Sequence, residues 1–160
     1  MISLMKQGIR LLLYVLLFWP TLAQGQYNIT AYQRNDGLPA NLTKTTIQDD
    51  LGFIWIGTDL GLVRYDGQEF VELSEGLPSP YVKSFFKTRD GKLIAITDQG
   101  MVSITSLPDS VSLQPYTPMP NGDSLEVRYP KEGQISCDGS MWITERKRIS
   151  RVRGSSITQY

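Results

Sequence analysis

The stretch "IWIGTDLGLVRYDG", residues Ile54 to Gly67, contains two short apolar runs on either side of a Thr-Asp-x-Gly turn and ends in Asp-Gly. Asp-Gly between strand-forming residues is a strong signal for a tight β-hairpin. The run that begins at Ile54 is continuously apolar, which is typical of a strand buried on both faces of its sheet. The stretch therefore predicts strands at 53–57 and 62–65, with a further strand at 68–73 after the hairpin turn. A preceding strand is predicted at 42–48.

The same pattern recurs 39 residues later. Residues 37–63, "GLPANLTKTTIQDDLGFIWIGTDLGLV", align without a gap to residues 76–102, "GLPSPYVKSFFKTRDGKLIAITDQGMV". Nine of the 27 aligned positions are identical, whereas average residue usage would give about two. The identities include one lysine and the turn glycines, which suit backbone positions that need a positive φ. The chain therefore contains a tandem repeat.

A third, weaker copy follows at an offset of 87 residues. The segment "DGSMWIT" at 138–144 corresponds to "LGFIWIG", which places Trp142 at the position of Trp55. The insertion before this copy lies near residues 106–125, whose prolines and glycine indicate a loop. The third copy departs from the pattern, because Glu145 stands at the repeat's threonine and Arg148 at its second turn glycine.

A period near 40 residues with several short strands per copy is typical of a β-propeller. We expect an all-β fold of four-stranded antiparallel blades, with about three blades in an incomplete ring. The blades are expected at about 37–73, 76–113 and 124–160. Residues 27–33, "YNITAYQ", predict an orphan strand that would close the ring as the outer strand of its last blade. Because propellers usually have about four to eight blades, three blades predict the N-terminal fragment of a longer protein.

Residues 1–25 predict a signal peptide. Two basic residues precede a nine-residue apolar run at 11–19, and small residues follow. Cleavage is expected after Ala23 or Gly25. Nine apolar residues rise only about 14 Å as a helix, about half the hydrocarbon core of a bilayer, so export is favoured over a membrane anchor. We therefore expect the mature chain, from about residue 26 to 160, in the periplasm or outside the cell.

Composition excludes several function classes. Acidic and basic residues balance at 16 each, so there is no electrostatic reason to expect a nucleic-acid partner. The chain has no histidine and one cysteine, Cys137, for which a buried position is favoured over a reactive thiol. The basic run "ERKRISRVR" at 145–153 is assigned to a solvated outer face, with anion binding as the alternative. The sequence shows no phosphate-binding glycine loop, metal cluster or nucleophile–base pair, so no cofactor, metal or catalytic residue is expected.

Most distinctive residues are assigned to the structure of the repeat. Its aspartates lie in turns beside glycines, where aspartate commonly caps its own backbone, and this reading is preferred over catalysis or calcium binding. The two strand tryptophans are expected to pack between blades rather than to stack on sugars. Tyr116 and Tyr129, assigned to the inserted segment, are the candidates for ligand binding. The residues assigned to the repeat are Gly37, Pro39, Gly52, Trp55, Thr58, Asp59, Gly61, Tyr65, Asp66, Gly67, Gly76, Pro78, Gly91, Thr97, Asp98, Gly100, Gly139 and Trp142.

The first copy resembles the two-component regulator propeller repeat. The family's pattern runs Gly-Leu-Pro, Asp-x-x-Gly, an apolar-Trp-apolar strand, Thr, Asp-x-Gly-Leu and Arg/Asn-Tyr-Asp-Gly. The first copy matches this pattern almost throughout, whereas the second has Ile94 at the tryptophan and lacks Tyr-Asp-Gly. The resemblance covers about residues 27–160 and is strongest up to Met101.

This resemblance implies the sensor region of a membrane histidine kinase. In such proteins an exported propeller precedes a β-sandwich domain, one membrane span and a cytoplasmic kinase, often with a DNA-binding output domain. The segment itself is then not an enzyme, because the kinase's phospho-accepting histidine is not in it. The implied partners are the remaining blades, the downstream signalling domains, an extracellular small molecule or oligosaccharide, and a second copy of the chain. Two alternatives stay open: a secreted interaction scaffold, and a secreted propeller enzyme of the lyase or glycosidase type.

Overall fold

The computed structural model describes residues 27–118 and 127–160, so the expected signal peptide lies outside the described residues. The chain divides into two units, Met1–Ala31 and Tyr32–Tyr160, and every described strand belongs to the second. Within the described ranges, no helix combines the length and the apolar character needed to cross a membrane.

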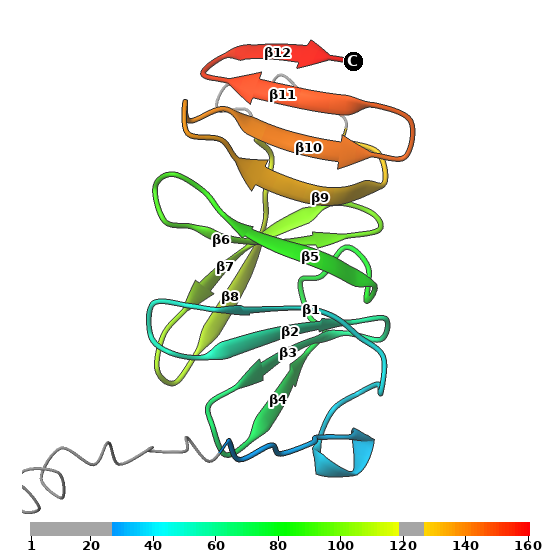
Figure 1. Ribbon diagram of the computed structural model, residues 1–160, viewed down its shortest axis with the longest axis vertical. Coiled ribbons are helices and arrows are strands. Elements are labelled where there is room, and N and C mark those ends of the chain that lie inside the picture. Colours follow the sequence, from blue (N-terminus) through cyan, green and yellow to red (C-terminus); the bar gives the residue numbers. More distant parts are fainter. Residues whose placement is uncertain (1–26, 119–126) are drawn as a thin grey trace, which may run out of the picture. The chain divides into compact units, whose positions relative to one another are not determined.

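The described strands form three four-stranded antiparallel sheets, and in each sheet the strand order follows the chain (Figure 1). The first sheet contains β1 (Thr43–Gln48), β2 (Ile54–Thr58), β3 (Leu62–Tyr65) and β4 (Phe70–Leu73). The second contains β5 (Val82–Lys87), β6 (Leu93–Thr97), β7 (Met101–Ser106) and β8 (Val111–Pro115). The third contains β9 (Pro130–Ile135), β10 (Met141–Glu145), β11 (Ile149–Arg153) and β12 (Ser156–Gln159).

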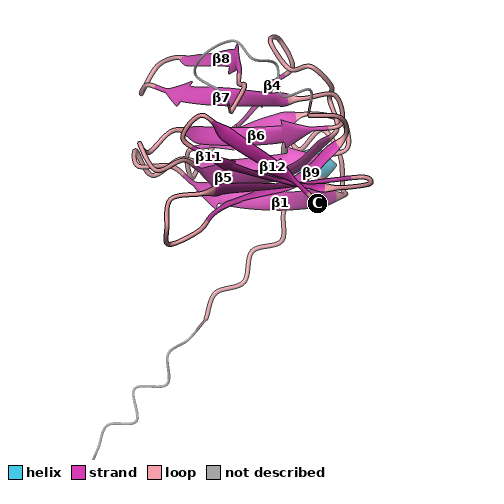
Figure 2. Ribbon diagram, turned by 90° about the horizontal axis from the view of Figure 1, so that it is seen from above, coloured by secondary structure: helices cyan, strands magenta, loops and turns pink. Residues whose placement is uncertain are grey.

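These sheets are three propeller blades in an incomplete ring, so the predicted all-β propeller fold is confirmed. Strands β1, β5 and β9 begin their blades and lie close together, as Figure 2 shows, with β5 in contact with both of the others. The repeat offsets also predict the strand register, because equivalent residues face each other across the first two strands of every blade. The equivalent pairs are Ile47–Trp55, Phe86–Ile94 and Gln134–Trp142.

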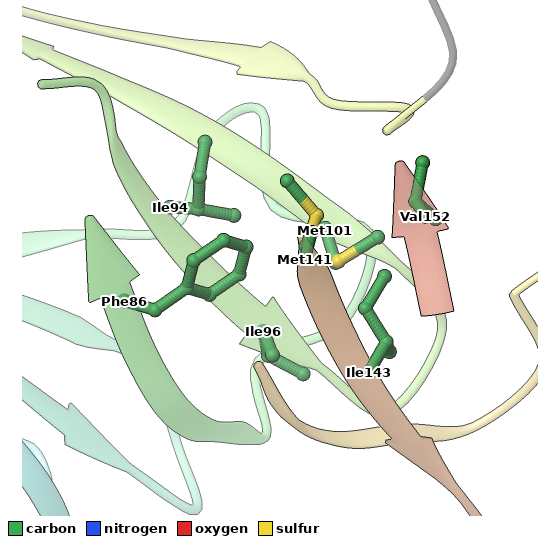
Figure 3. Close-up of a cluster of buried hydrophobic side chains, with 7 residues drawn as sticks. All are labelled: Phe86, Ile94, Ile96, Met101, Met141, Ile143 and Val152. Carbon is green, nitrogen blue, oxygen red and sulfur yellow. The ribbon is translucent and has the colours of Figure 1, made fainter. Parts of the chain in front are cut away.

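Two hydrophobic cores lie between successive blades. Alternate side chains of a strand point to opposite faces of its sheet, so Trp55 of β2 meets Leu93 and Ala95 of β6 in the first core. In the same way, Ile94 of β6 meets Ile143 of β10 in the second core. Figure 3 shows this second core, which consists of Phe86, Ile94, Ile96, Met101, Met141, Ile143 and Val152.

Successive blades approach closely at two glycines. A Cβ added to Gly133 of β9 would lie 2.6 Å from ring carbons of Phe86. A Cβ added to Gly57 of β2 would lie 2.8 Å from methyl carbons of Thr45 and Val82. Since real Cβ contacts are longer than this, glycine is what allows the blades to pack at their present separation.

The strand expected at 27–33 is not formed. These residues carry no regular secondary structure, and a short 3₁₀ helix, η1 (Arg34–Asp36), follows them. A strand needs a neighbour that accepts and donates ladder hydrogen bonds, and none of the described strands pairs with this segment. Tyr32 instead packs on the first blade, with its hydroxyl 2.9 Å from that of Tyr65 and its ring edge-on to Phe70 at 5.2 Å. Its role in closing the ring stays a prediction.

Candidate functional site: the lysine face of the blades

The ends of the blades form two faces. At one end the chain enters β1, β5 and β9, and the β2–β3, β6–β7 and β10–β11 turns lie beside these starts. We call this end the lysine face, for the residues described next. The opposite face carries the β1–β2, β5–β6 and β9–β10 turns together with the outer hairpin turns. Loops at the ends of rigid strands are where binding residues are commonly placed.

Each inner strand has a lysine as its second residue. These inner-strand lysines are Lys44 of β1, Lys83 of β5 and Lys131 of β9. Two residues before each lysine stands a large side chain, and the three tripeptides are Leu42-Thr43-Lys44, Tyr81-Val82-Lys83 and Tyr129-Pro130-Lys131. Because β1, β5 and β9 are neighbours, the repeat brings three lysines and two tyrosines to one end of the fold.

The middle lysine is held in place by its own blade and by the third blade. The Lys83 ammonium forms an ion pair with Asp98 and donates a hydrogen bond to the Pro130 carbonyl at 3.2 Å. Its side chain is only 18% exposed. Lys44 lies over the Tyr81 ring, with Nζ 5.1 Å from the ring centroid. Lys44 and Lys131 are exposed, and neither forms an ion pair with any other described residue.

The β2–β3 and β6–β7 turns on this face are capped by threonine. Thr58 Oγ1 donates to the Gly61 carbonyl at 2.9 Å and accepts from the Leu60 N–H at 3.1 Å. Thr97 makes the equivalent bonds in the second blade, including one of 3.0 Å to Gly100. The expectation that the adjacent aspartates cap these turns is therefore wrong, because the hydroxyl one residue earlier already occupies the backbone groups.

The two aspartates consequently face other groups. Asp98 is available to pair with Lys83. Its counterpart Asp59 does not pair with Lys44, and Asp59 Oδ1 is buried without a hydrogen-bond partner among the described residues. A buried carboxylate oxygen without a donor is unfavourable. The lysine face therefore contains a buried acceptor, Asp59 Oδ1, that receives no hydrogen bond from the described residues.

The third blade rebuilds this turn with charged residues. Glu145 replaces the capping threonine, and its side chain is 2% exposed. The carboxylate accepts from the Arg128 N–H at 3.1 Å, from Arg148 Nε at 2.9 Å and from the Ser150 hydroxyl at 2.9 Å. Arg146 stands where the other blades have aspartate, and it is exposed together with Lys147. The buried glutamate thus organises a turn that presents extra cations to solvent.

The two tyrosine candidates lie in different cavities. Tyr129 lines a cavity of about 360 Å³ together with Arg128 and Glu145–Arg148. It has a φ of 52°, which makes it the one non-glycine residue in the left-handed region among the described residues. Tyr116 lines a separate cavity of about 210 Å³ and packs against the core between the second and third blades. Burial raises the pKa of the Tyr116 hydroxyl. Tyr129 therefore belongs to the lysine-face cluster, whereas Tyr116 supports the core.

On the opposite face the aspartates do cap their turns. Asp49 Oδ1 accepts from the Leu51 and Phe53 N–H groups, each at 3.0 Å, and Oδ2 accepts from Trp55 Nε1 at 2.9 Å. The backbone N–H groups of Glu69 and Gln68 hold the pKa of Asp66 below its usual value.

Asp138 caps the turn of the third blade. Hydrogen bonds from Ser136 and Ser140, together with one from Arg151 Nη2 at 2.7 Å, hold the pKa of its carboxyl well below its usual range.

Several charges on the opposite face have partners. Lys87 pairs with Asp50 of the first blade at 2.6 Å, Lys92 pairs with Asp90 at 3.0 Å, and Arg151 pairs with Asp138. A cavity of about 270 Å³ on this face is lined by both signs of charge. The two faces therefore differ in degree. Among the described residues, four exposed cations of the lysine face have no acidic partner, namely Lys44, Lys131, Arg146 and Lys147, whereas on the opposite face Lys87, Lys92 and Arg151 are paired and Arg89 is not.

The Cys137 thiol and the basic run at 145–153 both differ from what the sequence led us to expect. Cys137 is exposed, so the expectation of a buried thiol is wrong; it lies in the β9–β10 turn, where Asp138 and the serines make the internal contacts. The basic run at 145–153, assigned to a solvated outer face, is solvated only in part. Its first part forms the lysine-face turn, where Arg146 and Lys147 are exposed, and its second part forms β11, where Ser150 and Val152 are buried. Within the described ranges, no group of histidine, cysteine, aspartate and glutamate side chains could hold a metal ion.

Sequence reasoning did not assign a role to the inner-strand lysines, although a signal was present. Lysine is one of the nine identities between the first two copies. Lys131 also aligns with Lys44 at the offset of 87 residues that aligns Trp142 with Trp55. A buried strand needs no lysine at a fixed position, so a lysine at the same place in all three copies indicates a common environment.

Comparisons with known proteins show the fold. No family model matches the chain, and neither does any curated protein. Among solved structures, the extracellular domain of the hybrid two-component system BT3049 from B. thetaiotaomicron matches with a TM-score of 0.65 and 20% identity, over 82% of this chain and 18% of that one. The extracellular domain of the one-component system BT4673 from the same organism matches with a TM-score of 0.54 and 16% identity, over 81% and 19%.

A lyase is also similar. A catalytically inactive histidine-to-alanine variant of virginiamycin B lyase from Staphylococcus aureus, with quinupristin, matches with a TM-score of 0.53 and 17% identity, over 78% of this chain and 42% of that one. The chain thus spans less than a fifth of the two-component domains it matches. At these identities the similarity establishes the propeller fold, and the sensor domains among the neighbours agree with the resemblance seen in the sequence.

Proposed function

We propose that this chain is part of the exported sensor propeller of a two-component signalling protein. Its blades hold a ligand-binding face outside the cytoplasm, and ligand binding is coupled to a membrane histidine kinase and a transcriptional output. The observation that carries the proposal is the match to the BT3049 extracellular domain over 82% of the chain, in a sequence whose first copy follows the two-component propeller repeat.

The exposed blade faces support further blades in the full protein. Trp55 is fully buried beneath the second blade, whereas Trp142 at the same position is partly exposed, with its ring stacked on Tyr160 and beside the Arg151 guanidinium. On the outward face of the first blade, Tyr65 and Phe70 stack on each other at 4.2 Å. Apolar blade faces of this kind are stable when another blade covers them, and we propose that additional blades do so.

A secreted propeller enzyme is the second candidate, because the lyase shares the fold. The lyase named above is inactive when a histidine is replaced, and this sequence supplies no histidine. The lysine face offers cations and tyrosines, which bind anions and sugars, rather than a paired general acid and base. These groups favour binding over chemistry in this part of the protein.

Phosphotransfer in membranes tests the proposal. Membranes that contain the full-length protein should incorporate phosphate from ATP faster when a fractionated oligosaccharide mixture is added on the sensor side. A double substitution, Trp55→Ala with Ile94→Ala, should abolish the response because it disrupts two inter-blade contacts. Steady cleavage of the added oligosaccharide by the full-length protein, without any change in phosphorylation, would support the enzyme and refute the sensor.

A further inference from the structure

We infer that the lysine face is a site for an anionic oligosaccharide, one that carries carboxylate or sulfate groups on successive sugars. This inference deepens the proposed sensor function, and it rests on that function only for its consequence in signalling. Binding itself rests on Lys44, Lys131, Tyr81 and Tyr129, which the repeat brings to one end of the inner strands.

Two of the three inner-strand lysines have no acidic partner among the described residues. Lys83 is largely buried, paired with Asp98 and bonded to the Pro130 carbonyl, so it has a structural role. Lys44 and Lys131 hold the same strand position, but both are exposed and form no ion pair with another described residue; Lys44 lies over the Tyr81 ring. An anion that reaches either ammonium group gains an electrostatic attraction that no described carboxylate supplies to it.

The two faces differ in how their charges are arranged. On the opposite face, Lys87 pairs with Asp50, Lys92 with Asp90 and Arg151 with Asp138. Arg89 of the same face is exposed and forms no ion pair with another described residue. On the lysine face, the third blade instead replaces the repeat's aspartate by Arg146 and adds Lys147. Positive charge therefore accumulates where β5 and β9 begin. Grouped cations raise the local concentration of anions and steer them to the site.

Aromatic residues accompany the lysines on this face. Tyr81 and Tyr129 stand two residues before their lysines, so an aromatic ring accompanies a cation at the start of two adjacent inner strands. Tyr129 is 57% exposed and lines the cavity of about 360 Å³. An aromatic ring with a polar tip offers an apolar face to the C–H groups of a sugar and a hydroxyl for hydrogen bonding.

The backbone of Tyr129 gives independent support. A non-glycine residue in the left-handed region costs free energy, and Tyr129 precedes a proline, which narrows its choices further. Asparagine or glycine would sit there with less strain. Strained residues concentrate at binding sites, where the position of the side chain matters more than local stability.

The repetition favours an extended ligand over a single small ion. A lone phosphate or sulfate would be satisfied by one cluster of donors, whereas here the cation recurs once per blade along three neighbouring strands. A linear chain with a charge on each sugar can contact several blades at once. The combination of repeated cations and exposed tyrosines therefore matches an acidic oligosaccharide.

Calorimetric titration of the full-length protein tests this inference. The probes are tetragalacturonic acid, a sulfated tetrasaccharide, a neutral tetrasaccharide of glucose, and inorganic sulfate. We expect at least one acidic probe to bind, with affinity that falls as salt rises, and we expect the neutral probe and sulfate alone to bind at least about tenfold more weakly. The Lys44→Gln/Lys131→Gln double variant should lose about tenfold or more in affinity for the acidic probe.

Two controls make the result specific. Lys92→Gln removes an exposed lysine from the opposite face and should leave acidic-probe affinity unchanged. Tyr129→Asn keeps a residue that tolerates the left-handed backbone, so it should weaken binding while leaving the melting temperature within a degree or two. Unchanged melting of the double lysine variant, measured alongside, separates lost binding from lost folding.

The inference is overturned if no acidic probe binds, if neutral and acidic probes bind equally, or if the double lysine variant binds as tightly as the parent. The sensor proposal is judged by a different readout. Phosphotransfer that responds to a neutral oligosaccharide and is unaffected by Lys44→Gln/Lys131→Gln would refute the anionic site and keep the sensor. Acidic-probe binding without any phosphotransfer response would keep the anionic site and refute the sensor.

Discussion

Trp55 and Trp142 occupy the same position in the second strand of the first and third blades, yet Trp55 is fully buried and Trp142 is partly exposed. The Trp55 ring lies under the second blade, and its Nε1 donates to Asp49 at 2.9 Å. The Trp142 ring stacks on Tyr160 at 6.0 Å and lies 5.3 Å from the Arg151 guanidinium. The same side chain is therefore an inter-blade core residue where a following blade covers it, and a surface residue where none of the described sheets does.

The packing of Ile143 between the second and third blades predicts the effect of Ile143→Ala. Ile143 of the third blade is fully buried in the core that it shares with Phe86 and Ile94 of the second. Removing its side chain should lower the free energy of unfolding by about 2–5 kcal/mol, because the cavity lies between two sheets that can collapse only partly. Denaturant titration measures the loss. Ile149→Ala is the matched control, since Ile149 is 43% exposed in the same sheet and should lose less than about 1 kcal/mol.

The close approach of β5 and β9 predicts that Gly133→Ala is destabilising. The new methyl group would lie 2.6 Å from the Phe86 ring, so either the ring or a strand must move. A loss of about 1–3 kcal/mol is expected from such overpacking. The exposed neighbour Gln134→Ala should change stability by less than about 0.5 kcal/mol. Adding Phe86→Leu should make Gly133→Ala less costly than it is alone, and a simply additive double mutant would contradict the proposed contact.

The glutamate that replaces the repeat's threonine should be essential to its turn. Glu145→Ala leaves the Arg128 N–H and the Ser150 hydroxyl without their carboxylate acceptor. We expect a loss of about 1–3 kcal/mol by thermal or chemical unfolding, since a buried donor without an acceptor bears its desolvation cost. Glu145→Gln keeps an acceptor oxygen and should lose less. Glu132→Ala, at an exposed position of β9, is the control, and an equal effect at both positions would refute the role of Glu145.

Asp138 predicts a pH dependence of stability. Hydrogen bonds from Ser136 and Ser140 lower the pKa of its carboxyl in the folded chain, so folding favours the ionised form. The resulting stabilisation is complete above the ordinary carboxyl pKa and is lost as the pH falls below it, because the unfolded chain binds a proton first. The melting temperature of Asp138→Asn should lie below that of the parent at pH 7, with the gap narrowing toward pH 3. A gap that is the same at both pH values, or that Asp109→Asn reproduces, would contradict this account.

Much of the fold can be predicted from the sequence, because the repeat fixes where equivalent residues lie. The offsets of 39 and 87 residues align Trp55, Ile94 and Trp142, and these residues do face equivalent partners across β1, β5 and β9. The Asp66-Gly67 hairpin turn follows from the positive φ that glycine supplies, and Gly67 has a φ of 101°. Local chemistry of this kind repeats wherever the sequence repeats.

The remaining features depend on partners that a local pattern does not identify. Residues 27–33 have strand-forming side chains, but a strand needs a hydrogen-bonding neighbour, and none of the described strands is one. Asp98 lies beside a glycine turn, but its partner is a lysine on another strand, while Thr97 caps the turn. Cysteine is usually a buried residue type, which is why a core position was expected for Cys137. The Asp138 carboxylate instead accepts the hydrogen bonds of this turn, and the Cys137 thiol stays exposed.

The central structural claim is that the repeats are equivalent blades, each of which packs between two others in the full-length protein. Hydroxyl-radical footprinting with residue-level mass spectrometry tests it directly by comparing the oxidation rates of Trp55 and Trp142. We predict that both tryptophans are strongly protected in the native full-length protein and become reactive together on denaturation. A Trp142 that oxidises at the rate of a solvent-exposed tryptophan while Trp55 stays protected would show that no blade covers the third sheet, and would contradict the account.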